Sequence, residues 1–282
     1  MSALRTKVVA PSSALGDGQQ LAAGIALLRS WGLQIEASPD PARHWGYFAG
    51  SDGERLADFS GTAELWACAR GGWGAARLLE RGWQPPGGYL LGFSDVTSLL
   101  WAQQAAGVSG AIHGPLVTTL ASEPAWSQQR LQRLLAGETP DPLQGRGWSG
   151  GRAAGPLLAG NLTVATHLLG SPHCPPLAGA ILLLEDVSEA PYRLDRLLTH
   201  WRLCGALQQL AGIGLGRFLG CERAEDEQRP GFELEQVLRE RTGDLGIPVV
   251  ADLPFGHGAE NAALPLGITV ELDGSSGVLS AA

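Results

Sequence analysis

Hydrophobic and polar positions follow two different periods along the first half of the chain, and these periods predict strands that alternate with helices. Short apolar runs rich in β-forming residues predict strands at residues 7–12, 33–38, 63–69 and 88–93. Between them, apolar residues recur every three or four positions, as on one face of a helix, at residues 19–32, 75–82 and 96–106. Repeated strand–helix units predict a parallel sheet covered by helices on both faces.

The pattern changes after this first half. Residues 137–155 are rich in glycine, proline and polar side chains and show no period, so they predict a linker. We therefore expect two domains, an N-terminal α/β domain over residues 1–136 and a smaller, more β-rich domain over residues 156–282.

The second half contains fewer helical patterns. Apolar runs predict buried strands within residues 178–186 and 246–258, and an Asp-Gly pair predicts a hairpin within 267–281. One long amphipathic helix is expected over residues 192–210. The glycine-rich stretch at 212–220 has the wrong spacing for a dinucleotide loop and predicts a turn into a strand. We interpret the charged segment 221–233 as part of the surface and assign it no function.

Composition and charge restrict the class of protein. The chain has 282 residues, of which 44% are hydrophobic and 17% charged, as in a core-forming globular protein. Its net charge of −8 gives no electrostatic footprint for nucleic acid or for an anionic membrane surface. Lys7 is the only lysine, which excludes a P-loop lysine and lysine-based covalent chemistry elsewhere.

The four cysteines and the apolar segments indicate the compartment. Cysteines stand at positions 68, 174, 204 and 221, without a CxxC pair or a spacing shared with histidine. We therefore expect no disulfide scaffold and no metal site, which suits a reducing cytoplasm. No segment approaches eighteen uninterrupted apolar residues, and the N-terminus lacks the apolar region of a signal peptide.

Ser94 stands where a predicted strand becomes a predicted helix, within the stretch GGYLLGFSDVTSLLW. A sharp turn there lifts a side chain out of the core, and backbone N–H groups at the helix start can stabilise an oxyanion. This position suits a serine nucleophile, although Val96 replaces the second glycine of a GxSxG elbow. The alternative is that Ser94 or Asp95 simply caps the helix.

A serine nucleophile needs a base and a group that orients the base. Of the six histidines, His257 is flanked by glycines on both sides and follows a strand-like run, although it can equally be a solvated loop histidine. Glu185 follows four large aliphatic residues in ILLLED, which places a carboxylate at the end of a strand. It can also be an ordinary surface acid. No spacing rule connects either residue with Ser94.

Seven stretches together resemble the LD-carboxypeptidase family of serine peptidases, whose other branch contains the microcin C immunity peptidases. They occur in the family's order and cover both predicted domains: VVAPSS (8–13), ARGGWG (69–74), GFSDVTSLL (92–100), HGPL (113–116), GNLTV (160–164), LLLEDVSEAPYRLDRLL (182–198) and FGHGAENAALPLG (255–267).

The resemblance implies a catalytic triad drawn from both domains. Ser94 matches the family's nucleophile, Glu185 its orienting carboxylate and His257 its base. The backbone N–H groups of Asp95 and Gly72 are implied to form the oxyanion hole. The family fold pairs an N-terminal Rossmann-like α/β domain with a C-terminal domain built on a small β-barrel, in agreement with the two domains read from the pattern.

The resemblance also implies a substrate class. Family members remove the terminal D-alanine from murein tetrapeptides during cell-wall recycling in the cytoplasm, through an acyl-enzyme and without a metal or cofactor. Homodimers are common in the family, so a homodimer is expected. A carboxypeptidase must bind a free carboxylate, for which Arg70 is a candidate, although it can also brace its own loop. Trp73, where tyrosine is common in the family, is a second candidate for substrate binding.

Two alternatives stay open. The chain can hydrolyse an acyl-amino-acid nucleotide conjugate, as in the microcin immunity branch, although its short segments between motifs favour the murein branch. It can also be a catalytically silent ligand-binding protein on the same scaffold. The presence of all three triad residue types argues against that second alternative.

Overall fold

The computed structural model describes residues 4–16, 18–223 and 230–282. The chain divides into two compact units, and each is described here by itself. The first unit comprises Met1–Glu138, Gly170–Pro175 and Ala262–Leu266, and the second comprises Thr139–Leu169, Pro176–Asn261 and Gly267–Ala282. Residues 224–229 of the charged segment, which we assigned to the surface, lie outside the described residues.

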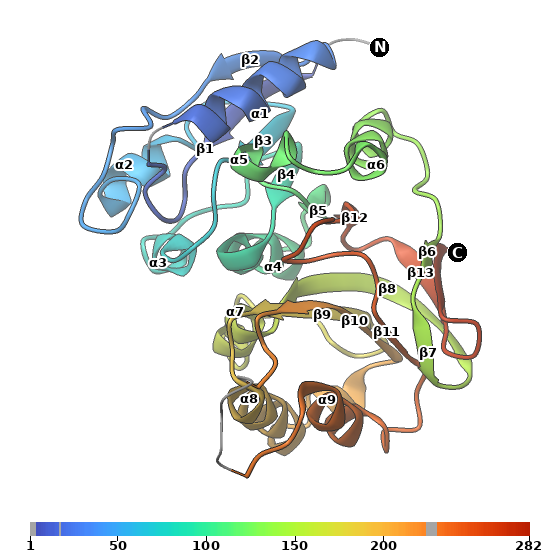
Figure 1. Cartoon of the computed structure of the whole chain (residues 1–282). Coiled ribbons are helices and arrows are strands. Elements are labelled where there is room, and N and C mark those ends of the chain that lie inside the picture. Colours follow the sequence, from blue (N-terminus) through green and yellow to red (C-terminus); the bar gives the residue numbers. More distant parts are fainter. Residues whose placement is uncertain (1–3, 17, 224–229) are drawn as a thin grey trace. The chain divides into compact units, whose positions relative to one another are not determined.

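The first unit is a six-stranded sheet in the order β12-β5-β4-β3-β1-β2 (Figure 1). Its strands are β1 (Arg5–Val9), β2 (Gln34–Ala37), β3 (Leu65–Cys68), β4 (Tyr89–Gly92), β5 (Ala111–His113) and β12 (Leu264–Pro265). The first five strands pair in parallel, and β12 joins β5 antiparallel. The parallel sheet predicted from the alternating periods is therefore confirmed.

Helices connect these strands and cover both faces of the sheet (Figure 1). They are α1 (Gln19–Ser30), α2 (Asp52–Ala57), α3 (Ala75–Glu80), η1 (Ser94–Val96), α4 (Thr97–Ala105), α5 (Val117–Leu120) and α6 (Ala125–Leu135). Helices α1, α5 and α6 pack on one face, and α3 and α4 lie on the other. This is the α/β arrangement that the first half of the sequence predicts.

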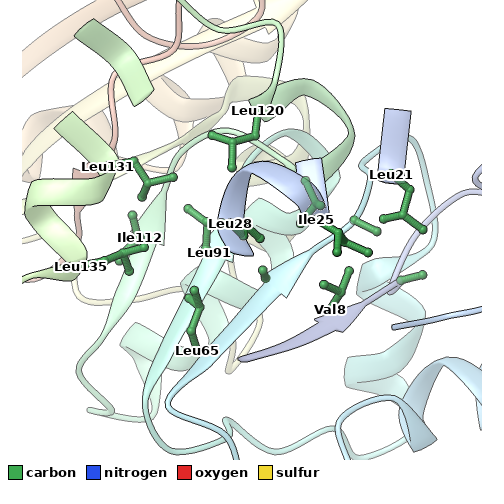
Figure 2. Close-up of a cluster of buried hydrophobic side chains, with 14 of the residues drawn as sticks. Val8, Leu21, Ile25, Leu28, Leu65, Leu91, Ile112, Leu120, Leu131 and Leu135 are labelled. Atoms are coloured by element: carbon green, nitrogen blue, oxygen red, sulfur yellow. The ribbon is translucent and has the colours of Figure 1, made fainter. Parts of the chain in front are cut away.

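The core between α1 and the sheet follows from helical spacing. Leu21, Ile25 and Leu28 recur at intervals of four and three residues, so all three point at the strands, where they meet Val8 and Leu65 (Figure 2). Full burial of one such aliphatic side chain contributes roughly 1.5–3 kcal/mol. These contacts hold the sheet whose carboxyl edge carries the candidate site.

The strand order reverses at β1, and this reversal matters for that carboxyl edge. From β1 the chain moves to β2 on one side, whereas β3, β4 and β5 follow on the other side. In open α/β sheets, such a reversal separates the loops after the two neighbouring strands and marks the usual place for a ligand. The loops after β1 and β3 therefore flank the position that a substrate is expected to occupy on this unit.

The second unit is built on an eight-stranded mixed sheet in the order β6-β14-β13-β8-β9-β10-β11-β7. Its strands are β6 (Leu143–Gln144), β7 (Arg146–Ser149), β8 (Arg152–Asn161), β9 (Ile181–Val187), β10 (Gly212–Leu219), β11 (Val249–Ala251), β13 (Thr269–Asp273) and β14 (Val278–Ala281). The glycine-rich stretch is thus a strand, β10. The hairpin predicted from the Asp-Gly pair is confirmed as β13 and β14.

In the described part of this unit, the helical segments are α7 (Leu162–Leu168), α8 (Pro191–Leu203), η2 (Leu207–Gln209) and α9 (Leu234–Thr242). Helix α8 ends earlier than the predicted limit of residue 210. Gly205 follows its last turn with φ +73°, and the apolar residues beyond it belong to η2. A left-handed glycine of this kind ends a helix even where the apolar spacing continues.

The eight-stranded sheet curls toward closure. Its two edge strands, β6 and β7, are separated in the chain by Gly145 alone, so one short segment supplies both edges. A Cβ at Gly147 would lie 2.2 Å from the carbonyl oxygen of Gly274, which shows how closely β7 approaches the β13–β14 turn. This is the small barrel-like architecture expected for the C-terminal half.

The segment predicted as a linker, residues 137–155, carries β6, β7 and the first residues of β8. Its glycines permit close backbone approach, and its strands are held by main-chain pairing rather than by a recognisable side-chain pattern. The limits of the two predicted domains stay a prediction. Within residues 4–16, 18–223 and 230–282, no helix has the length and apolar character needed to span a membrane.

Candidate active site

Ser94 is the first residue of η1 and lies at a strained turn just after β4. Its φ is +62°, a left-handed conformation that costs an L-residue roughly 1–2 kcal/mol. Gly92 makes the turn possible, because a Cβ there would lie 2.8 Å from Cγ1 of Val96. Within the described structure, neither η1 nor α4 has a side-chain cap hydrogen bond, so the capping interpretation is not what the geometry shows.

The loop after β3 with the sequence RGGWG, residues 70–74, passes directly beside Ser94. A Cβ at Gly71 would lie 2.9 Å from Cβ of Ser94 and 3.0 Å from its Oγ, so only glycine fits there without a shift. The same point is 3.6 Å from the backbone nitrogen of Asp95. Gly72 has φ +105°, and a Cβ on it would lie 2.4 Å from Oγ of Ser13. The two predicted oxyanion residues thus belong to segments that contact each other around Ser94.

The loop after β1 supports the RGGWG loop. The backbone N–H of Ser13 donates to the carbonyl oxygen of Gly71 at 3.3 Å. In the opposite direction, the backbone N–H of Trp73 donates to Oγ of Ser13 at 3.1 Å. These bonds join the two loops that flank the reversal in strand order.

Asp95 follows the serine and points into the protein. Only 1% of the residue is exposed, and its Oδ2 accepts a hydrogen bond from the backbone N–H of Ala75 at 2.8 Å. Burial raises the pKa of Asp95 to about 6, against the lowering effects of the Ser12 hydroxyl, the Ala75 N–H and the positive charge of Arg55. The carboxyl therefore caps α3, the helix that follows the RGGWG loop, rather than the helix that follows Ser94.

The two candidate substrate-binding residues differ in their contacts. Nη1 of the exposed Arg70 donates to the carbonyl oxygen of Ala14 at 2.8 Å, so this side chain braces the loop after β1. Trp73 is 47% exposed beside the same loop. Their contact with a substrate stays a prediction.

Glu185 and His257 form a hydrogen-bonded pair in the second unit. Glu185 lies on β9 and is fully buried, and its Oε2 lies 2.6 Å from Nδ1 of His257. The same oxygen accepts the backbone N–H of His257 at 3.1 Å. A carboxylate at Nδ1 selects the tautomer in which Nδ1 carries the proton, and Nε2 is then the basic nitrogen. A general base and its orienting acid need a hydrogen bond of this kind.

Glycines shape the loop that presents His257. Gly256 has φ +99°, and a Cβ on it would lie 2.6 Å from both Cβ and Cγ of Glu185. Its backbone N–H donates to Oδ1 of the buried Asn261 at 2.9 Å. On β10, a Cβ at Gly216 would lie 2.6 Å from the carbonyl oxygen of Phe255. The loop therefore packs against β9 and β10 only because these positions lack side chains.

The neighbouring acid, Asp186, has a different role. It accepts hydrogen bonds from Nδ2 of Asn161 at 3.0 Å and from the backbone N–H and Oγ1 of Thr163 at 2.9 and 2.8 Å. Burial raises the pKa of Asp186 above its usual range, although these donors oppose the shift. Successive residues of a strand face opposite sides, so Glu185 meets the histidine while Asp186 anchors the start of α7.

The structure thus brings together two parts of the predicted site, each within its own unit. Glu185 is paired with His257 in the second unit, and Ser94 lies with Gly72 and Asp95 in the first. Sequence reasoning missed Gly71 and Asn261, whose roles depend on close approach and burial. In the ranges described, no three histidine, cysteine or acidic side chains gather as a metal site would require.

Comparison with known proteins gives a consistent result. The family model for the LD-carboxypeptidase N-terminal domain matches residues 6–114, and the family model for the LD-carboxypeptidase C-terminal domain matches residues 154–272. A Synechocystis sp. protein whose name describes it as a carboxypeptidase is 47% identical over 98% of this chain and 93% of its own. The murein tetrapeptide carboxypeptidase of Pseudomonas aeruginosa is 36% identical over 96% of this chain and 94% of its own.

Solved structures show the same fold. The muramoyltetrapeptide carboxypeptidase from Oxalobacter formigenes superposes with a TM-score of 0.85 at 26% identity, over 97% of this chain and 96% of that one. The microcin C7 self-immunity protein MccF superposes with a TM-score of 0.86 at 18% identity, over 100% of this chain and 96% of that one. At 18% identity, the second likeness shows the fold alone.

Proposed function

The chain belongs to the LD-carboxypeptidase family of serine peptidases, and we propose that it releases the terminal D-alanine of murein tetrapeptides by hydrolysing an L,D peptide bond. The observation that carries this proposal is the pair of Glu185 and His257, with 2.6 Å between Oε2 and Nδ1. A buried carboxylate that fixes the tautomer of a histidine is the arrangement that activates a serine.

In the proposed reaction, Nε2 of His257 accepts the proton of Ser94 as Oγ attacks the carbonyl carbon of the L,D bond. Glu185 holds the imidazole in its orientation and stabilises the imidazolium that forms. The oxyanion of the tetrahedral intermediate accepts hydrogen bonds from the backbone N–H groups of Gly72 and Asp95. One well-placed donor of this kind contributes about 3–4 kcal/mol to a transition state.

The intermediate then collapses. The C–N bond breaks, His257 gives its proton to the departing amine of D-alanine, and an acyl-enzyme remains on Ser94. Water attacks this ester with His257 again as the base, and the shortened peptide leaves. The cycle uses one water molecule and returns the serine and histidine to their starting protonation states.

Support for a murein substrate comes from the relatives. The Pseudomonas aeruginosa protein is named a murein tetrapeptide carboxypeptidase, and this chain matches it over nearly the full length of both. The homodimer and the cytoplasmic site of action expected from the family resemblance belong to the same proposal. Cleavage of acyl-amino-acid nucleotide conjugates, suggested by the second branch of the family, is the alternative that the experiment must distinguish.

The test is product analysis with three substrates: free tetrapeptide, disaccharide-tetrapeptide and an aspartyl-adenylate-type conjugate. We expect release of D-alanine from the murein substrates by the wild-type protein and its loss in Ser94→Ala. Ser122→Ala, which changes an exposed serine after α5, is the matched control and should keep full activity. Intact murein substrates with the wild-type protein would overturn the proposal, and cleavage of the conjugate alone would favour the alternative.

A further inference from the structure

One peptide group beside the candidate oxyanion hole is held from both sides by buried charged residues. The carbonyl oxygen of Gly74 accepts a hydrogen bond from Nη1 of Arg55 at 2.8 Å. The N–H of the same peptide group, on Ala75, donates to Oδ2 of Asp95 at 2.8 Å. This peptide group ends the RGGWG loop, so its position determines where that loop lies.

The same two residues also reach the loop after β1. Nη1 of Arg55 donates to the carbonyl oxygen of Pro11, and the carboxyl of Asp95 lies beside the hydroxyl of Ser12. Arg55 therefore contacts both loops that flank the reversal in strand order, and Asp95 contacts the end of the RGGWG loop. Asp95 is in turn the residue next to the nucleophile, so the contacts join both loops to the turn at Ser94.

Arg55 is itself rigidly held. It extends from α2 and is fully buried, and its Nη2 donates to Oδ1 of Asp52 at 2.5 Å. Nη2 of Arg77 donates to Oδ2 of the same carboxylate at 2.7 Å, and these two cations hold the pKa of Asp52 well below its usual range. Phe48 lies against the guanidinium of Arg55, 4.5 Å from ring centroid to Cζ. A guanidinium with this set of partners has little freedom to move.

A glycine-rich loop needs such anchors. Glycine has no side chain to restrict its backbone dihedral angles, so the Gly71–Gly72 backbone would sample many conformations without such anchors. An oxyanion hole, however, must present its donors within about 0.5 Å of their working positions. In the described part of the first unit, Arg55 and Asp95 supply contacts to this loop that are both buried and charged.

We propose that Arg55 and Asp95 are positioning residues that fix the Gly71–Gly72 backbone beside Ser94 and so set the geometry of the oxyanion hole. This inference rests on the proposed function, because it assumes that Ser94 is the nucleophile. Neither side chain is assigned any contact with the substrate. Their effect reaches the reaction through the Gly74–Ala75 peptide group and the loop that it ends.

The first readout separates kcat from KM. Arg55→Met and Asp95→Ala each remove one side of the clamp, and we expect kcat to fall about 10- to 100-fold with KM within about twofold, because the oxyanion forms only in the transition state. Arg55→Lys and Asp95→Asn keep part of the interaction and should recover part of the rate. Leu28→Ala, in the core between α1 and the sheet, is the control for simple destabilisation (Figure 2).

The second readout is affinity for a peptide boronic acid, which forms a tetrahedral adduct with a serine and places an oxygen in the oxyanion hole. Its affinity should fall in each variant by about the same factor as kcat/KM, as for a transition-state analogue. A merely structural role would lower the unfolding free energy without this correlation. All rates are therefore expressed per folded molecule, as measured by circular dichroism at the assay temperature.

The outcomes are decisive in either direction. If the Arg55 and Asp95 variants match Leu28→Ala in kcat per folded molecule and in boronate affinity, the inference is wrong. If the Arg55 variants do not fold, the pair Asp95→Ala and Asp95→Asn gives the same comparison. Failure of the proposed function would look different, because the wild-type protein itself would then release no D-alanine.

Discussion

Gly256 offers the sharpest test of the pairing between acid and base. A Cβ at this position would lie 2.6 Å from both Cβ and Cγ of Glu185 and 2.8 Å from its Oε2. Contacts below 3.4 Å are already unusually tight, so in Gly256→Ala the side chain of Glu185 and the backbone of residue 256 must separate by about 0.8 Å, the difference between 3.4 and 2.6 Å. The substitution thus acts on the proposed catalytic pair without altering either of its members.

The size of the effect follows from one hydrogen bond. The bond between Glu185 and His257 is 2.6 Å long, and a displacement of about 0.8 Å stretches it to about 3.4 Å, beyond a useful hydrogen bond. A hydrogen bond to a charged group contributes roughly 1.5–3 kcal/mol. Since each 1.36 kcal/mol corresponds to a factor of ten, kcat should fall about 10- to 150-fold.

Backbone strain must be separated from this contact. Gly256 has φ +99°, so alanine there also costs roughly 1–2 kcal/mol in stability through its conformation alone. Gly246 is the matched control, because it lies in the same unit with φ +71° and a Cβ on it would meet nothing within 4 Å. Gly246→Ala should lose similar stability in urea unfolding but keep kcat within about twofold.

The assay measures D-alanine release from murein tetrapeptide at saturating substrate. Enzyme concentration is corrected for the folded fraction obtained from the unfolding curve of each variant. If Gly256→Ala and Gly246→Ala have the same kcat after this correction, the hydrogen bond between Glu185 and His257 has no catalytic role. The assignment of these two residues as acid and base would then be refuted.

Four further changes test other parts of the structure. Asp95→Asn removes a carboxyl whose pKa burial raises to about 6 from an ordinary 3.8, so between pH 3.5 and 7 the unfolding free energy of the wild type should fall by about 3 kcal/mol relative to the variant. Glu185→Gln keeps an acceptor but removes the charge that stabilises the imidazolium, and kcat should fall about 10³-fold in the D-alanine assay. Gly71→Ala places a Cβ 2.9 Å from that of Ser94 and should slow labelling by a fluorophosphonate about 10²-fold. Gly24→Ala places a Cβ 1.8 Å from a backbone carbonyl oxygen of α5 and should cost about 3 kcal/mol in urea unfolding.

Each of these expectations has a contrary result. Parallel pH curves for the wild type and Asp95→Asn would mean that the buried carboxyl does not take up a proton on folding in this range. A Glu185→Gln enzyme with near-normal kcat would exclude a charged partner for His257. Unchanged fluorophosphonate labelling in Gly71→Ala, or unchanged stability in Gly24→Ala, would contradict the close approaches at those glycines.

The sequence predicted the first unit well because its elements bury side chains with clear periods. The limits of the observed β1, β2, β3 and β4 fall within about three residues of those of the predicted runs, since each strand combines apolar side chains with a following turn. Residues 137–155 gave no such signal. There β6 and β7 are short, and Gly147 must be glycine because the backbone of Gly274 comes so near. The glycines that permit this close approach also interrupt the apolar alternation from which a strand would be predicted.

The sequence predicted those candidate site residues that combine a reactive side chain with a position at the end of a predicted strand. Glu185 and His257 each stand at the end of an apolar run, and their hydrogen bond agrees with the roles that the family resemblance implies. The role of Arg55 was not predictable. The capping box of Ser51 and Glu54 marks the start of α2, but nothing in a single sequence shows that the next arginine is fully buried against two loop carbonyls. Burial of a charge is a property of the folded chain.

Two unfavourable features of the first unit lie at consecutive residues. Ser94 is held in a left-handed conformation, and burial makes the ionised form of Asp95 unfavourable until about pH 6. Both costs are offset by the surrounding contacts: Gly71 and Gly92 leave room for the serine turn, and Ala75 N–H and the charge of Arg55 stabilise the carboxylate. Between about pH 4 and 6 the growing fraction of carboxylate strengthens the hold of Asp95 on the Gly74–Ala75 peptide group, while the fold loses stability. We therefore expect activity and stability to respond in opposite directions as the pH rises through this range, because one carboxyl acts on both.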